Sequence, residues 1–325
     1  MFKTGFSTAV LGVMAACLLL AACAPQQPSA QPSNPDSSLE GNLTVSGAWA
    51  LYPMMQRWAE EFHKLHPGVT IDVSAGGAGK GMADTLAGVV DIGMVSRDVT
   101  SEEESKGAYW VAVTKDAVFP MVNAQNPVLQ DLLHKGVRRD TFIDIYITGA
   151  VTNWGQVVGR PEVTDEIHVY TRSDAAGAPE TWAKYLGKKQ EDLLGLGVYG
   201  DPGLAEAVVK DPLGIGFNNL GYAYDAATGL PVAGAVVLPI DSNENGVADA
   251  DELLETKDEA VNAVATGKYP SPPARALNLV TKGKPTAVVQ AFLLWILTDG
   301  QQYVSEAGYI QLTPDQLEAS LQKVR

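Results

Sequence analysis

The chain has 325 residues, 46% of them hydrophobic and 19% charged, and a formal net charge of −15. This composition is typical of globular domains with an ample core, and the length favours about two domains. The negative charge argues against nucleic acid as a partner, because binding a phosphate backbone requires basic patches. It does not exclude a small anion, because backbone N–H groups and arginines can make a locally positive pocket in an acidic protein.

The N-terminus has the pattern of a secretory signal. Lys3 is the only charge ahead of an apolar run over 9–22, which is too short for a comfortable transmembrane helix. The run ends in L-A-A-C at 20–23, which resembles a bacterial lipobox, so residues 1–22 are predicted to be a signal peptide and Cys23 a lipidated first residue. A simple signal peptide with a coincidental cysteine is the alternative. Cleavage would remove Lys3 and take the net charge from −15 to −16.

Cleavage would also remove Cys17, the other of the two cysteines. No thiol would then remain for a disulfide, a zinc site or a cysteine nucleophile. Residues 24–38 are rich in Pro, Gln, Ser and Asn, a composition that cannot bury a core. We therefore interpret 23–40 as a lipidated cysteine and a flexible tether, and expect an extracytoplasmic protein anchored to a bacterial membrane.

The folded part is predicted to begin near Gly41 with alternating strands and helices. The pattern predicts strands at 43–45, 69–73 and 89–95, and helices at 54–65 and 82–86. A glycine-rich loop at 75–81 precedes the second helix, and Ser96 follows the third strand. Such an alternation predicts a parallel sheet with ligand-binding groups at the carboxyl ends of its strands.

The rest of the chain continues the α/β pattern. Helices are predicted at 131–147 and 181–186, strands and tight turns across 195–221, and strands at 235–240 and 275–281. The segment 286–297 is apolar nearly all round and is predicted to be a buried helix. Thr313 is the predicted N-cap of a last helix that ends at Arg325.

The stretch from Val169 to Trp182 is the strongest candidate for an anion site. Arg172 follows a predicted strand, and the small residues at 175–178 lead into a helix with Pro179 in its first turn. A helix N-terminus attracts an oxyanion because its first N–H groups have no intrahelical partner. Arg172 adds a planar charged fork suited to bidentate contact with phosphate-like groups. An ordinary strand-to-helix turn with a surface arginine is the alternative.

Several ordered segments together carry a resemblance to a known family. They include T-V-S-G at 44–47, L-Y-P at 51–53, A-G-G-A-G-K-G at 75–81, D-I-G-M-V-S-R at 91–97, V-Y-T-R-S-D at 169–174 and D-P-L-G-I-G-F at 211–217. The chain resembles the phosphate-binding protein of bacterial phosphate ABC importers. The resemblance implies a two-lobed α/β periplasmic-binding-protein fold of type II, with mixed sheets flanked by helices, a hinge and an inter-lobe cleft. It implies lobe I at 41–117 plus 272–325 and lobe II at 118–271.

The same resemblance implies a function. It implies a monomeric receptor without organic cofactor that binds phosphate or a similar tetrahedral oxyanion between the lobes and delivers it to a membrane permease. Carried over by position, the implied ligand-binding residues are Ala50, Leu51, Ala78, Gly79, Ser96, Arg172, Ala176, Gly177 and Ala178.

The candidate site departs from the family in its hydroxyl groups. Positions where the family usually has a hydroxyl are apolar here: Ala48 or Ala50, then Ala78, Ala176 and Ala178. A hydrogen bond to a charged group contributes about 1.5–3 kcal/mol, so these losses could weaken phosphate binding. Lys80 is our candidate for compensation, because it would bring a point charge to the pocket. A solvated surface lysine is the alternative.

Residues 241–252, with the sequence D-S-N-E-N-G-V-A-D-A-D-E, match a twelve-residue EF-hand-type calcium loop. The predicted Ca²⁺ ligands are Asp241, Asn243, Asn245, the carbonyl of Val247, Asp249 (directly or through water) and Glu252. Because a strand precedes the loop and there is only one such loop, we predict an isolated structural site rather than a paired sensor. An acidic surface turn without metal is the alternative.

Two further function classes are an enzyme and a calcium-binding surface protein. An enzyme would need a nucleophile or an acid–base pair, and the sequence has neither a G-x-S-x-G elbow nor clustered histidines. We therefore predict that the protein is not an enzyme. A surface-anchored calcium-binding sensor or adhesion protein, built on the same fold with a different ligand, is the alternative function.

Overall fold

The computed structural model describes residues 39–325. The predicted signal peptide, Cys23 and the tether up to residue 38 therefore lie outside the described residues. The chain divides into two units, 1–37 and 38–325, and the fold described below belongs to the second. Between residues 39 and 325, no helix is long and apolar enough to cross a membrane.

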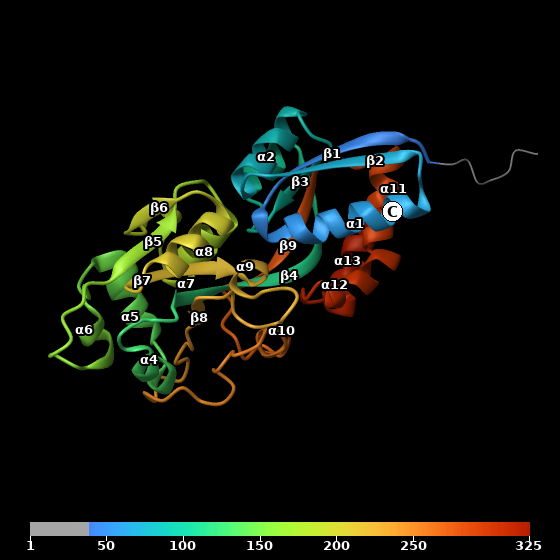
Figure 1. The fold of residues 1–325 in the computed structure, drawn as a ribbon. Coiled ribbons are helices and arrows are strands. Elements are labelled where there is room, and N and C mark those ends of the chain that lie inside the picture. The colour runs from blue at the N-terminus through green and yellow to red at the C-terminus, as the bar shows by residue number, and fades with distance from the viewer. Residues whose placement is uncertain (1–38) are drawn as a thin grey trace, which may run out of the picture. The chain divides into compact units, whose positions relative to one another are not determined.

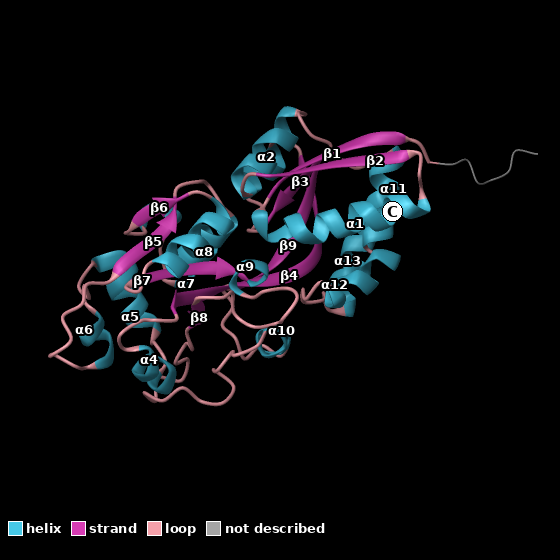
Figure 2. Cartoon of the chain, viewed as in Figure 1, coloured by secondary structure: helices cyan, strands magenta, loops and turns pink. Residues whose placement is uncertain are grey.

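One mixed sheet of nine strands runs through the described part of the chain (Figures 1 and 2). Its order is β2-β1-β3-β9-β4-β7-β5-β6, with β8 paired to β4. The strands are β1 (Gly41–Gly47), β2 (Val69–Ala75), β3 (Ile92–Val95), β4 (Ala108–Asn123), β5 (His168–Arg172), β6 (Leu196–Val198), β7 (Gly214–Asn219), β8 (Ala235–Val237) and β9 (Ala274–Lys282). The strands β1, β2 and β3 are mutually parallel, as are β5, β6 and β7, so each end of the sheet resembles a small parallel sheet.

Two long antiparallel strands connect these parallel ends. The first part of β4, residues 108–117, pairs with β9, and the second part, 118–123, pairs with β7 and β8. Strand β4 thus changes partners between Ala117 and Val118 and belongs to both halves of the sheet.

Helices and short helical turns connect and flank these strands (Figure 1). The α-helices are α1 (Tyr52–Leu65), α2 (Ala78–Ala87), α3 (Ser101–Ser105), α4 (Leu129–Lys135), α5 (Arg139–Ile143), α6 (Trp154–Val158), α7 (Gly177–Tyr185), α8 (Gly200–Lys210), α9 (Leu220–Ala223), α10 (Lys257–Ala265), α11 (Ala287–Ile296), α12 (Gln302–Glu306) and α13 (Pro314–Val324). The other helical turns are η1 (Trp49–Leu51), η2 (Asp144–Thr148), η3 (Gln190–Asp192) and η4 (Asp299–Gln301).

Two separate hydrophobic cores define two lobes. The first core is built from residues 43–113 and 277–324, with Trp58 and Phe62 fully buried in it. The second is built mainly from residues 117–269, where the Trp182 ring of α7 stacks on Phe217 of β7. The predicted two-lobed α/β fold is therefore confirmed. The predicted lobe boundaries stay predictions, and Ile310, which was assigned to lobe I, packs in the second core.

Some predicted elements were wrong in extent. Helix α2 begins at Ala78 rather than residue 82, so most of the glycine-rich loop is the first turn of a helix. Strand β3 begins at Ile92 rather than residue 89, because Gly88 ends α2 in a left-handed conformation and a turn follows. The predicted helix 131–147 is broken at Gly136, where φ is +67°, into α4, α5 and η2.

One other prediction was wrong in kind, and the helix predicted at 286–297 is present as α11 but was wrong in its burial. The region 195–221, predicted as strands and turns, contains the eleven-residue helix α8 between β6 and β7. Helix α11 is buried along its second half only, at Phe292, Leu293, Trp295 and Ile296, so it is not buried all round. The predicted cap at Thr313 is confirmed, since its hydroxyl accepts the Gln316 N–H in a capping box.

Candidate functional site

The start of α7 is the centre of the candidate site. Strand β5 ends at Arg172, and Ala176, with extended backbone angles, is the N-cap of the helix. Gly177 and Ala178 occupy the first two helical positions, where N–H groups have no intrahelical partner. A Cβ at Gly177 would overlap the Ser96 hydroxyl and the Ser96 carbonyl, so only glycine permits this approach of the two lobes.

The start of α2 approaches the same turn from the first lobe. Gly77 has φ of +90°, and a Cβ there would lie 2.8 Å from the Ala175 carbonyl oxygen. The Gly79 N–H donates to that same carbonyl, with an N–O distance of 3.1 Å. The structure thus brings Gly79, Ser96 and Gly177 together, although the Gly79 N–H donates to the opposite lobe rather than facing a ligand.

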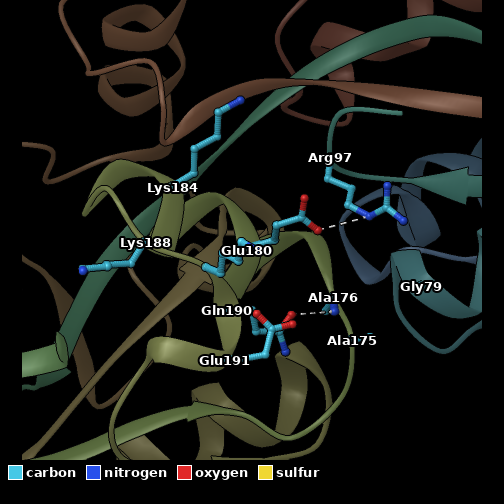
Figure 3. A pocket seen from close by; sticks show the side chains of 10 residues that line it. Gly79, Arg97, Ala175, Ala176, Glu180, Lys184, Lys188, Gln190 and Glu191 are labelled. Carbon is cyan, nitrogen blue, oxygen red and sulfur yellow. Dashed lines mark hydrogen bonds and ion pairs between the residues drawn. The ribbon is translucent and has the colours of Figure 1, made fainter. Parts of the chain in front are cut away.

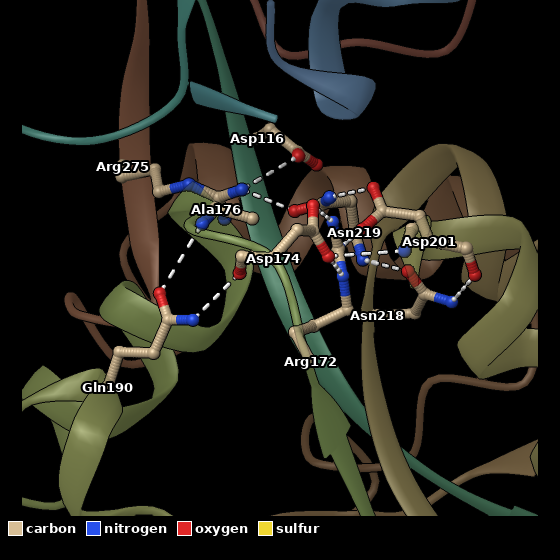
Figure 4. Close-up of polar contacts among 10 residues, drawn as sticks. Asp116, Arg172, Asp174, Ala176, Gln190, Asp201, Asn218, Asn219 and Arg275 are labelled. Carbon is tan, nitrogen blue, oxygen red and sulfur yellow. Dashed lines mark hydrogen bonds and ion pairs between the residues drawn. The ribbon is translucent and has the colours of Figure 1, made fainter. Parts of the chain in front are cut away.

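Arg172 is held between two carboxylates (Figure 4). Its Nε and Nη2 donate to Asp174 at 2.8 and 2.5 Å, and its Nη1 donates to Asp201 at the start of α8. Only 1% of the Arg172 side chain is exposed. Three of its five N–H donors are used, so one N–H on each Nη is not bonded to either carboxylate. Burial would lower the pKa of Arg172, but Asp201 and Asp174 raise it above its ordinary value.

A buried polar cluster extends from Arg172 to the connecting strands (Figure 4). Asp201 accepts from the Asn219 side chain, and the Asn219 oxygen accepts from Arg275 of β9. Arg275 also donates to the Ser96 carbonyl at 2.7 Å and lies 3.5 Å from Asp116 of β4. The cluster therefore links the ends of β3, β5 and β7 to both connecting strands.

Burial shapes the titration of this cluster. It raises the pKa of Asp201, and it raises the pKa of Asp116 to about 6, with Arg275 acting in the opposite direction. Burial likewise lowers the pKa of Arg275 below its ordinary value. With every group ionised, two arginines would face three aspartates, so the cluster as a whole does not supply positive charge to an anion.

The remaining predicted residues lie around this centre. Ala50 and Leu51 are buried in η1, where the Leu51 N–H donates to Ala48 and the Ala50 carbonyl accepts from Tyr309. The same turn packs against the start of α8, since a Cβ on Gly200 would lie 3.3 Å from the Trp49 ring.

Lys80 and the four alanines are placed less favourably for anion binding. The half-exposed Lys80 pairs with Asp84 one turn along α2. Ala48, Ala78, Ala176 and Ala178 are all buried and supply no hydroxyl. Ser96 is therefore the one hydroxyl in the predicted ligand-binding set.

A cavity of about 410 Å³ lies beside the α7 start (Figure 3). It is lined by Gly79, Arg97, Ala175, Ala176, Glu180, Lys184, Lys188, Lys189, Gln190 and Glu191. Two ion pairs connect the lobes beside this cavity. Arg97 of the first lobe pairs with Glu180 of the second at 3.1 Å, and Asp98 of the first lobe pairs with Lys184 of the second at 2.6 Å. The residues that follow Ser96 are thus tied to the helix that carries Gly177.

Sequence reasoning missed Asp201, Asn219, Arg275 and Gln190 as site residues. The sequence around Asp201 could have predicted a site residue. Asp201 lies at the start of a helix directly after a short strand, as in the predicted anion-binding turns. Gly200, Pro202 and Gly203 hide this helix start, because such residues are typical of turns. Arg275 lies 179 residues from Ser96, and no local pattern predicts a pairing over that distance.

The loop 241–252 is folded around its own acidic side chains. Asp241 is 2% exposed and accepts the Asn245 and Gly246 N–H groups at 3.0 and 2.9 Å. Glu252 accepts the Ser242 and Asp249 N–H groups, and Gly246 has φ of +79°. Across residues 39–325, no group of three or more His, Cys, Asp or Glu side chains is arranged so that it could hold a metal ion. The calcium site therefore stays a prediction.

Comparison with known proteins gives consistent matches along the chain. A model of the PBP superfamily domain matches residues 30–300. The chain is 30% identical to the phosphate-binding protein PstS of Bacillus subtilis (strain 168), covering 93% of this chain and 92% of that protein. It is 26% identical to the phosphate-binding protein PstS of Methanocaldococcus jannaschii, covering 91% and 89% of the two chains.

Solved structures share the fold. A substrate-binding protein with bound phosphate from Clostridium perfringens aligns with a TM-score of 0.67 and 24% identity, over 84% of this chain and all of that one. An ABC-type phosphate transport receptor from Vibrio cholerae aligns with a TM-score of 0.60 and 21% identity, over 83% of this chain and all of that one.

The buried Asp116 predicts a pH-dependent effect of Asp116→Asn on stability. Below pH 3.8 the carboxyl is protonated in the folded and unfolded states, and above pH 6 it is ionised in both, so the cost of burying its charge grows as pH rises between these values. At 1.36 kcal/mol per pH unit the full cost is about 3 kcal/mol. Between pH 4.5 and 7.5, urea unfolding should show the wild type losing about 2 kcal/mol relative to the variant. A difference in unfolding free energy between wild type and variant that does not change with pH would contradict the raised pKa of Asp116.

Proposed function

The chain belongs to the PBP superfamily, within the family of the phosphate-binding protein PstS, and we propose that it is the solute receptor of an ABC importer. In this proposal it binds phosphate, or a similar tetrahedral oxyanion, between its lobes and delivers it to a membrane permease. The observation that carries the proposal is the meeting of the α7 start with Ser96 and the α2 start across the lobes. Helix starts of this kind favour anions, because unpaired N–H groups and the helix dipole act together.

The proposed ligand contacts follow from the donors at this point. Ala176, Gly177 and Ala178 offer their N–H groups, of which that of Ala176 is bonded to Gln190 in this structure. Ser96 offers its hydroxyl, and Arg172 offers the N–H groups that Asp174 and Asp201 leave free. Backbone donors dominate this set, and the usual hydroxyls are absent at Ala78, Ala176 and Ala178. The affinity for phosphate is therefore expected to depend strongly on the few polar side chains that remain.

The relatives named above support a receptor rather than an enzyme. The relatives from Bacillus subtilis and Methanocaldococcus jannaschii are both named as phosphate-binding proteins. We propose accordingly that the chain acts as a non-enzymatic, monomeric receptor. No finding favours the alternative of a calcium-binding sensor or adhesion protein with a different ligand.

The first test is calorimetry on ligand-stripped protein with phosphate, sulfate, arsenate, molybdate and small phosphonates. We expect phosphate to bind, and Ser96→Ala to weaken it about 10- to 100-fold, because a hydrogen bond to a charged group contributes about 1.5–3 kcal/mol. Ser105→Ala is the matched control, since Ser105 is exposed on α3 and bonds only to its own helix. Absence of heat with every oxyanion at millimolar concentration would refute the proposed function.

We also propose that the chain is anchored through a lipid on Cys23. The support is the L-A-A-C motif at the end of the apolar run. Cys23→Ala should accumulate as an unprocessed precursor that retains residues 1–22, whereas Cys17→Ala, inside the same run, should be processed normally. Mass spectrometry of the N-terminus measures both, and normal processing of the Cys23 variant would exclude the anchor.

We propose in addition that loop 241–252 binds Ca²⁺. The support is the twelve-residue spacing of oxygen-bearing side chains. In the structure Asp241, Asp249 and Glu252 accept hydrogen bonds from donors of their own loop. These oxygens are the hard ligands that Ca²⁺ prefers. Chelation should lower the melting temperature of the wild type but not that of an Asp241→Ala, Glu252→Ala double variant. Equal responses of the two proteins to chelator would remove the site.

A further inference from the structure

The side chain of Gln190 is bonded to the turn that starts α7 (Figures 3 and 4). Its Oε1 accepts the Ala176 N–H at 3.3 Å, and its Nε2 donates to the Asp174 carbonyl at 2.7 Å. Gln190 begins η3, which follows α7 in the chain and packs against it. One carboxamide thus bridges both ends of the segment 174–176.

The bond to Ala176 places a neutral acceptor at the start of the helix. Ala176 is the N-cap of α7, has no side chain that could cap the helix, and is 6% exposed. The Gln190 oxygen satisfies the buried N–H of the N-cap residue itself, a role that the side chain of the third helical residue has in a capping box. Hydrogen bonds in which the acceptor carries charge are roughly twice as strong as neutral ones, and an oxyanion gains further from the helix dipole. At this N–H an anion oxygen is a better partner than the amide oxygen of Gln190.

The geometry also permits an anion oxygen to replace the Gln190 oxygen at the Ala176 N–H. The Ala176–Gln190 distance of 3.3 Å lies beyond the usual range for an N–H···O bond, so this bond is weak. Gln190 is partly exposed and lines the cavity of about 410 Å³ together with Gly79, Ala175 and Ala176. Its side chain can leave the helix start by turning into that cavity. The cavity is then a route by which an anion reaches the Ala176 N–H.

We propose that Gln190 sets the affinity of the site by competing with the ligand for the Ala176 N–H. This inference rests on the proposed function, because it assumes that an oxyanion binds at the start of α7. In this account the anion enters through the cavity, displaces the carboxamide and takes over its hydrogen bond. Gln190 thus competes with the anion from within the protein. The stronger its bond to the Ala176 N–H, the more free energy the anion needs to displace it.

The test compares phosphate binding by the wild type, Gln190→Ala and Gln190→Glu in calorimetry. Gln190→Ala frees the N–H and should tighten phosphate binding about three- to tenfold. Gln190→Glu places a charged acceptor on the same N–H and adds repulsion, so binding should weaken at least about tenfold. A residue that only supports the fold of the turn would weaken binding in both variants, so the opposite signs are the diagnostic result.

The controls are Gln302→Ala and Gln302→Glu. Gln302 is exposed, starts α12 and donates its side-chain amide to the Asp299 carbonyl, which matches the second bond of Gln190 but lies on another helix. Neither change should alter phosphate binding more than about twofold. Melting curves check that each variant folds, and Gln190→Ser replaces Gln190→Ala if the latter does not.

The outcomes test the competition proposal and the proposed function separately. If the wild type binds phosphate and the small variant at 190 binds equally or more weakly, the competition proposal is overturned while the proposed function stands. If neither protein binds phosphate, both are overturned. Binding that is tighter in Gln190→Ala and weaker in Gln190→Glu supports both.

Discussion

The pairing of Arg172 with Asp174 and Asp201 is the interaction on which the candidate site depends. A buried guanidinium is tolerated only when it is paired, and removal of one partner of such a pair typically costs about 3–5 kcal/mol. These two carboxylates fix the end of β5, the turn before α7 and the start of α8 at one point. Through Asn219 and Arg275 the same cluster reaches Ser96 in the other lobe. The positions of the donors proposed to bind an anion are therefore fixed by side chains that need not contact the anion themselves.

This arrangement has an electrostatic consequence for a negatively charged ligand. Two arginines and three aspartates meet in the cluster, so the cluster has no excess of positive charge. Attraction of an anion must therefore come from backbone N–H groups, the helix dipole and the Arg172 N–H groups that are not bonded to Asp174 or Asp201. Burial raises the pKa of Asp116 and Asp201, which reduces their tendency to carry charge near the site. With no hydroxyl at Ala78, Ala176 and Ala178, a competing neutral acceptor such as Gln190 has a larger effect than it would in a site rich in hydroxyls.

Much of the fold follows from local patterns, and the site follows only in part. Apolar periodicity predicted α1 and α13, and turn chemistry predicted the strand-to-helix turn at Arg172 because small residues and Pro179 favour a helix start there. Helix α8 was missed because its first turn holds Gly200, Pro202 and Gly203, which are poor helix formers in a helix interior but tolerated at its start. The partners of Arg172 and Arg275 could not be predicted, since periodicity shows which face of an element is buried but not which distant residue it meets.

The central claim is that an oxyanion binds where the α7 start meets Ser96 between the lobes. The most direct measurement is an amide ¹H–¹⁵N titration of ligand-stripped protein with phosphate. The account predicts that the largest shifts, downfield in ¹H, occur at Gly177 and Ala178, while Gly246 and its neighbours in the loop 241–252 remain unchanged. Saturable shifts confined to other surfaces, with Gly177 and Ala178 unaffected, would contradict it.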